Sequence, residues 1–149
     1  MKRVAFVKSD KTIAPAETLW AEELSGNLYA LRNVPFSTYG FAEGDIVEAN
    51  SSDDGLQVAR LHWDSGNGTI WINFASATTE DDQKVILNEL TSVGCTYERS
   101  TSDVVGVTVP ANLQIAFEQL LGYLNQVTDQ GIVRGWLVSK EPKTSALTS

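Results

Sequence analysis

The chain has 149 residues, enough for one sizeable hydrophobic core or for two small ones that share an interface. Its 42% hydrophobic and 20% charged residues are ordinary for a globular protein, and no apolar run approaches the length that spans a bilayer. Residues 12–139 hold 5 basic and 17 acidic side chains, a net formal charge of −12, which argues against nucleic acid and anionic membranes as partners.

The amino terminus, MKRVAFVKSD, begins like a signal peptide with two basic residues. Its apolar patch is too short for that role, and Lys8 interrupts it. A single cysteine, Cys95, excludes an internal disulfide and gives no sign of an oxidising compartment. We therefore expect a cytoplasmic protein.

The first part of the chain has the pattern of a small antiparallel β module. Short runs that mix apolar and polar residues predict strands at 19–24, 28–33, 45–49 and 56–63. The sequences between them are rich in turn formers, such as Ser25-Gly26-Asn27 and Asp53-Asp54-Gly55. We expect residues 1–66 to form an all-β module shaped as a partial barrel.

The pattern changes after the turn at 65–68. A strand at 69–74 is followed by a helix that Thr78 and Thr79 open and Gly94 ends, then by strands at 97–100 and 104–110. A longer helix runs from Pro110 to Gly131, and a last strand covers 132–138.

This order is the split βαβ pattern of ferredoxin-like domains, in which two helices cover one face of an antiparallel sheet. The predicted fold class is therefore α+β, with an N-terminal β module packed on a C-terminal ferredoxin-like βαββαβ sandwich. We assign residues 67–139 to the second module and 140–149 to a flexible tail, and we expect one compact unit.

The strand at 69–74 indicates what lies on each face of the predicted sheet. Ile70, Ile72 and Phe74 share the face under the helices, which places Trp71 on the opposite face. Trp136 is a candidate for that opposite face, although the sequence does not fix its pairing. A face that carries Trp needs a cover. Either the N-terminal module or a partner provides it, and we favour the module because strand aromatics are commonly buried.

Few residues have the types and spacing that catalysis needs. His62, the only histidine, shares a strand face with Asp64, which suggests a catalytic pair. Ser65 follows directly, but closeness in sequence does not bring its hydroxyl to the His62 imidazole. Cys95 follows Gly94, and the sequence has no second histidine that could form a catalytic Cys-His pair with it. We therefore expect Cys95 to be a small buried residue. We predict no catalytic residues.

Metal and cofactor patterns are also missing from the sequence. One His and one Cys cannot complete a closed zinc site, and the pairs Asp53-Asp54 and Asp81-Asp82 lack the spacing of a calcium loop. The run at 66–68 lacks the lysine of a P-loop. We expect neither a cofactor nor a metal.

Five short motifs follow one another in a characteristic order. They are Leu19-Trp20-Ala21, Tyr29, Asn33-Val34-Pro35-Phe36, Gly44-Asp45-Ile46-Val47 and Ser65-Gly66-Asn67-Gly68-Thr69. Over residues 17–138 they resemble a bacterial family of uncharacterised proteins, domain of unknown function 4265. The resemblance supports the fold and implies no reaction or ligand, because the family has none established. The chain departs from the family pattern at Gly68 and Trp71, where we expect a small polar and a basic residue.

An acidic, cytoplasmic protein without catalytic groups has the profile of a stoichiometric inhibitor. Our first hypothesis is an immunity protein that neutralises a bacterial competition toxin by occluding a basic surface, since opposite charges speed association and aromatic anchors slow dissociation. For each acid, a solvated turn is the simpler interpretation. The predicted partner-binding residues are Tyr39, Phe41, Glu43, Asp45, Glu48, Asp53 and Asp54.

Two other hypotheses remain. The alternative function is a small-molecule-sensing or regulatory ferredoxin-like domain, which rests on the fold. The third is an enzyme that uses His62 and Asp64. For the whole chain we expect a protein partner, a basic toxin domain in the first hypothesis, no nucleic acid or membrane partner, and a monomer or weak homodimer.

Overall fold

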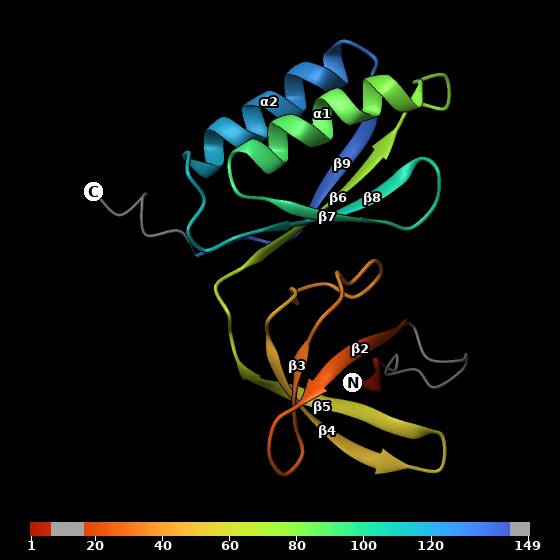
Figure 1. Cartoon of the computed structure of the whole chain (residues 1–149), viewed down its shortest axis with the longest axis vertical. Coiled ribbons are helices and arrows are strands. Elements are labelled where there is room, and N and C mark those ends of the chain that lie inside the picture. Colours follow the sequence, from red (N-terminus) through yellow and green to blue (C-terminus); the bar gives the residue numbers. More distant parts are fainter. Residues whose placement is uncertain (7–16, 144–149) are drawn as a thin grey trace.

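Two units of different architecture follow each other along the chain. The computed structural model describes residues 1–6 and 17–143, and its fold class is α+β as predicted. In Figure 1 an all-β unit lies at the bottom, and a sheet covered by two helices lies at the top. Neither described helix is both long and apolar enough to cross a membrane.

The first unit is a closed five-stranded barrel. Its strands follow the chain order, and each pairs in an antiparallel fashion with the next, while the first and the last pair in parallel. Side chains such as Val4, Leu31 and Val47 are buried inside it. The strands are β1 Lys2–Phe6, β2 Glu17–Glu23, β3 Leu28–Leu31, β4 Ile46–Ser52 and β5 Gly55–Trp63.

The strand that closes the barrel, β1, was not predicted from the sequence. We expected a partial barrel, but Val4 pairs with Leu19 of β2 on one side and with Leu56 of β5 on the other. Two basic residues and a four-residue apolar patch are a weak strand signal. The strand exists because both neighbours offer free backbone edges, and pairing removes those edges from solvent.

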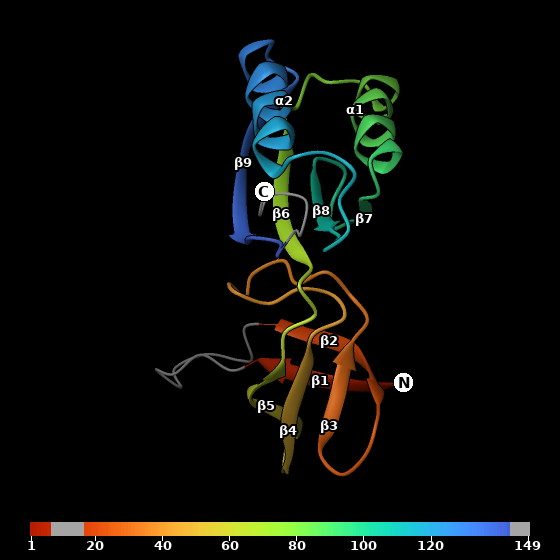
Figure 2. The same ribbon diagram turned by 90° about the vertical axis from the view of Figure 1, so that its left-hand side faces the viewer.

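The second unit is a four-stranded antiparallel sheet with the order β7-β8-β6-β9. Figure 2 shows both helices on the same side of this sheet. We call the other side the free face. The elements are β6 Gly68–Phe74, α1 Glu80–Ser92, β7 Thr96–Arg99, β8 Val104–Val109, α2 Phe117–Asp129 and β9 Val133–Lys140.

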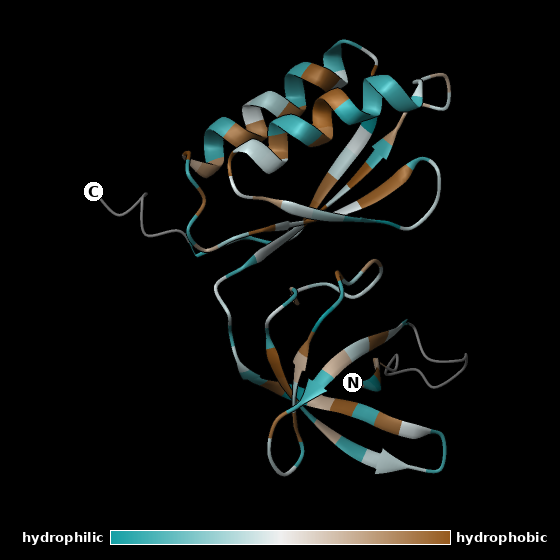
Figure 3. Cartoon of the chain, in the orientation of Figure 1, coloured by the Kyte–Doolittle hydropathy of each residue, from teal (hydrophilic) through white to brown (hydrophobic). Residues whose placement is uncertain are grey.

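The core of the second unit lies between the helices and the sheet. Leu87 of α1 and Leu124 of α2 are fully buried, and the prediction that Ile70, Ile72 and Phe74 lie under the helices is confirmed. Figure 3 shows the helices as alternating apolar and polar stripes, the pattern of helices with one buried face.

Three predictions about this unit need comment. The α2 helix begins at Phe117 and not at Pro110, because Leu113 N donates to Pro110 O and the chain first makes a turn. Trp136 pairs with Ile72 and packs on the helix side, so it does not join Trp71. Cys95 is buried as expected, and burial raises the pKa of its thiol to about 12.

Candidate functional site

The loop between β3 and β4, residues 32–45, connects the two units. Val34 N donates to the Glu98 carboxylate of β7 over 3.1 Å, while Phe36 N donates to Glu17 of β2 over 2.5 Å. The loop lies close to Gly106 of β8, where an added methyl group would lie 2.7 Å from Val34 Cγ1. Gly106 therefore allows the loop to contact the free face directly.

Trp71 lies on the free face, under this loop. Its indole Nε1 donates to Pro35 O over 2.5 Å, and the Tyr39 ring meets it edge-on with centroids 5.1 Å apart. The prediction that the N-terminal module covers Trp71 is therefore confirmed. The cover is partial, because Leu137, which pairs with Trp71, is 43% exposed.

A second set of contacts, the interunit joint, surrounds Asp45 at the end of the loop. Asp45 is fully buried, and its carboxylate accepts hydrogen bonds from Ala42 N at 2.9 Å and from Ser65 Oγ at 2.6 Å. Lys140 of β9 places its ammonium 2.9 Å from one carboxylate oxygen and 3.0 Å from the other. A buried carboxylate is therefore paired and hydrogen-bonded, as burial requires.

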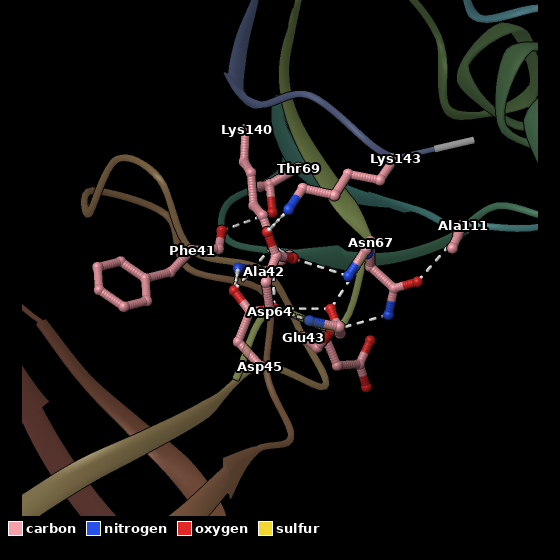
Figure 4. Close-up of polar contacts among 12 residues, drawn as sticks. Phe41, Ala42, Glu43, Asp45, Asp64, Asn67, Thr69, Ala111, Lys140 and Lys143 are labelled. Atoms are coloured by element: carbon pink, nitrogen blue, oxygen red, sulfur yellow. Dashed lines mark hydrogen bonds and ion pairs between the residues drawn. The ribbon is translucent and has the colours of Figure 1, made fainter. Parts of the chain in front are cut away.

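Asp64 extends the joint to the C-terminal segment. Lys140 Nζ lies 2.6 Å from its Oδ1 and Lys143 Nζ lies 2.9 Å from its Oδ2, and Figure 4 shows both lysines approaching it. Burial raises the pKa of Asp64, but the hydrogen bonds from Lys140, Gly66 N and Lys143 outweigh that effect and hold it well below its usual range. Asp64 is therefore an ionised structural group.

The Ser65–Thr69 turn completes the joint. Asn67 donates to Glu43 O over 2.9 Å and accepts from Ala111 N over 3.1 Å, so one side chain bridges the loop and the second unit (Figure 4). Thr69 Oγ1 donates to Phe41 O over 2.9 Å. These contacts give structural roles to Asp45 and Asn67, two residues of the motifs in the sequence analysis.

The joint corrects our prediction of a tail from residue 140. Lys140 ends β9, and Lys143 N donates to Gly66 O over 2.7 Å. The partners of both residues lie more than 70 positions earlier in the chain, so no local sequence pattern indicates these contacts. The rest of the predicted tail, residues 144–149, lies outside the described residues.

The predicted partner-binding residues do not form one exposed patch. Asp45 is buried in the joint, and the partly buried Phe41 packs against Phe6 in the barrel with ring centroids 4.7 Å apart, so neither is a fully exposed side chain. Glu43 accepts a hydrogen bond from Thr108 at 3.2 Å. Burial raises the pKa of Glu43 despite that bond.

The other predicted residues are more accessible. Glu48 pairs with Arg60 across the β4–β5 hairpin, with 3.2 Å between Oε2 and Nε. Asp53 and Asp54 are exposed at the tip of that hairpin. Tyr39 is 60% exposed although its ring contacts Trp71. The structure thus separates Tyr39 from the two hairpin acids.

A groove lies on the free face beside the loop. Its volume is about 460 Å³. Asn73 pairs with both Gly135 and Val104, so these three residues form one row across the floor, next to the row of Trp71 and Leu137. The groove is lined by Phe36, Trp71, Ile72, Asn73, Val104, Arg134, Gly135, Trp136 and Leu137, of which Ile72 and Trp136 have side chains that pack on the helix side of the sheet.

Gly135 keeps the floor of the groove open. A methyl group added at Gly135 would meet no atom within 4 Å, and its backbone is not in the left-handed region. Sequence reasoning did not identify this groove. A glycine inside a strand was the available signal, since it often marks a bulge or a close approach of a ligand.

The described residues do not form the His62–Asp64 pair of the enzyme hypothesis, and they offer no metal site. His62 is exposed on β5, while the Asp64 carboxylate contacts Lys140 and Lys143. Within residues 1–6 and 17–143, no group of three or more His, Cys, Asp and Glu side chains is placed to hold a metal ion.

Comparison with known proteins identifies the family. A solved structure, described as a novel crystal structure of a hypothetical protein from Neisseria gonorrhoeae, matches with a TM-score of 0.77 at 21% identity. The match covers 95% of this chain and 96% of the other, so it shows a shared fold. No curated protein matches significantly. The model of DUF4265, a domain of unknown function, matches residues 17–134, and the chain therefore belongs to this family.

Proposed function

We propose that the protein is a non-catalytic binding protein whose ligand site is the groove on the free face. One observation carries this proposal: an open, mostly apolar hollow of about 460 Å³ beside a fixed Trp71. Small-molecule sites are typically concave and apolar, with a few polar groups, and span roughly 300–1,000 Å³. The groove fits that description.

The arrangement of the second unit supports the same proposal. We infer a ferredoxin-like domain, since the order β7-β8-β6-β9 with both helices on one face is the one expected of a βαββαβ unit. In this interpretation the barrel acts as a cap that covers part of the free face and leaves the groove beside it. We propose that this site serves a small-molecule-sensing or regulatory role, in the cytoplasm.

The test is a titration of the protein with small naphthalene derivatives, followed by amide and indole NMR signals. We expect the signals of Trp71, Asn73 and Gly135 to shift together. The Gly135→Leu variant should lose binding because the new side chain fills the floor. Gly122→Leu, on the exposed side of α2, is the matched control and should bind normally. Shifts confined to other parts of the protein would contradict the proposed site.

A second candidate is the immunity protein that binds a basic toxin domain. The observation in its favour is the exposed acidic tip of the β4–β5 hairpin, together with the −12 charge of residues 12–139. Replacing Asp53 and Asp54 by Lys should slow association with the toxin encoded beside this gene, measured by surface plasmon resonance at low salt. Absence of binding to that toxin by the unaltered protein would exclude this candidate.

A further inference from the structure

We propose that the groove takes a small carboxylate with an aromatic or aliphatic body, and that Arg134 binds the carboxylate. This inference rests on the proposed binding function and specifies the class of ligand. It starts from a contrast among the described arginines.

Most described arginines have a guanidinium that contacts another side chain of the protein. Arg32 pairs with Glu22 at 2.7 Å, Arg60 with Glu48 at 3.2 Å, and Arg99 donates to Gln83 over 2.6 Å. Arg3 lies over the Trp20 ring at 4.6 Å. The Arg134 guanidinium has no ion pair or hydrogen bond with any described residue, although the body of the protein is strongly acidic. An unpaired guanidinium at the wall of an apolar groove is therefore the exception.

The backbone explains how Arg134 comes to line the groove. Asn73 pairs with Gly135, but the next residue, Phe74, pairs with Val133, so Arg134 is an extra residue in β9. Such a bulge redirects a side chain relative to regular strand alternation. Here the extra residue lines the groove beside Gly135, and its side chain is exposed.

The rest of the groove supplies the apolar half of the site. Trp71 and Leu137 are neighbours across β6 and β9, Phe36 comes from the loop, and Gly135 leaves space between them and Arg134. A flat ring or a short chain can cover this floor while a carboxylate meets the guanidinium. Arginine and carboxylate form two parallel hydrogen bonds, which fixes orientation as well as charge.

A comparison of 2-naphthoate with 2-naphthol separates the two parts of the proposal. Both have the same ring system, and at neutral pH only the first is an anion. We expect 2-naphthoate to bind roughly tenfold or more tightly, because hydrogen bonds to charged groups are the stronger ones. Binding is followed by the Trp71 indole NMR signal and by isothermal titration calorimetry.

Three variants assign the effect to particular residues. Arg134→Gln should remove the preference for the carboxylate and leave 2-naphthol binding unchanged, whereas Arg60→Gln, at an exposed arginine outside the groove, should change neither. Arg134→Lys keeps the charge but loses the paired hydrogen bonds, so it should recover only part of the preference. Gly135→Ala, a smaller change than Gly135→Leu, should weaken both ligands without affecting folding.

Each result has a separate meaning. Equal binding of the two compounds in the groove would overturn the carboxylate inference and leave the binding function intact. A preference for 2-naphthoate that survives Arg134→Gln would also overturn it. If neither compound shifts the groove signals, the proposed function and the inference fail together.

Discussion

The interunit joint and the groove lie on the same side of the second unit, but charged groups are paired in the joint and unpaired in the groove. In the joint, Asp45 is buried and its two oxygens accept from Ala42, Ser65 and Lys140. In the groove, Arg134 is a charge without a described partner beside apolar walls. We infer that paired charges hold the two units together, whereas the unpaired charge in the groove marks a place where a ligand can supply the missing group.

The largest expected effect comes from Lys140→Met. This change keeps the length of the side chain but leaves Asp45 buried without its cation, which costs about 3–5 kcal/mol of unfolding free energy. The matched control is Arg60→Met, which breaks an exposed pair with Glu48 and should cost at most about 1 kcal/mol. Urea unfolding measures both. Equal destabilisation by the two variants would mean that the buried pair of Lys140 and Asp45 stabilises the protein no more than an exposed ion pair does.

Asp64→Asn tests the ionised state of the joint. A carboxyl whose pKa is lowered in the folded protein stabilises the fold at any pH above the pKa that it has in the unfolded chain, which is near 4. This stabilisation is lost as the pH falls through the pKa of the folded state. The variant should therefore be less stable than the unaltered protein at pH 7, by about 1.5–3 kcal/mol. The gap should narrow below about pH 4. A gap that stays constant from pH 7 to pH 2 would show that Asp64 has an ordinary pKa.

Gly106→Val tests the close contact between the loop and the free face. A side chain there would meet Val34 at 2.7 Å and Phe36 at 2.8 Å, and overpacking of this kind costs about 1–3 kcal/mol. Gly135→Val on the same face is the control, since nothing lies within 4 Å of its new methyl group. Thermal unfolding should separate the two variants, and the contact is less tight than described if their midpoints coincide.

Trp71→Phe has the smallest expected effect. The ring contact with Tyr39 is largely kept, but the hydrogen bond to Pro35 O is lost, which costs about 0.5–1.5 kcal/mol. The same variant should change groove binding only slightly, because a Phe ring still provides an apolar wall. A change in stability as large as that of Lys140→Met would place Trp71, beside the joint, among the main contacts that hold the two units together.

The sequence was informative where structure depends on local pattern. Turn sequences and apolar spacing predicted the order of strands and helices from β2 to β9, including the face shared by Ile70, Ile72 and Phe74. The features that were not predicted from the sequence depend on pairing between strands that are distant along the chain. β1 is a strand because β2 and β5 flank it, and the face of Trp136 follows from a register with Ile72 that no local pattern encodes.

The candidate site was less predictable than the fold. Asp45 follows Gly44 and has the local appearance of a turn acid, whereas its burial depends on Ser65 and on Lys140, 95 positions away. Arg134 lines the groove because of a bulge in β9, and a bulge is a property of the paired strands. Gly135 was the one local sign of an open floor.

The most direct test of the account is a crystal structure of the protein with 2-naphthoate. We expect the ring to lie over Gly135, between Trp71 and Leu137, with its carboxylate on the Arg134 guanidinium and the Lys140 contacts to Asp45 and Asp64 unchanged. A ligand bound elsewhere on the molecule, with the groove left empty, would contradict it.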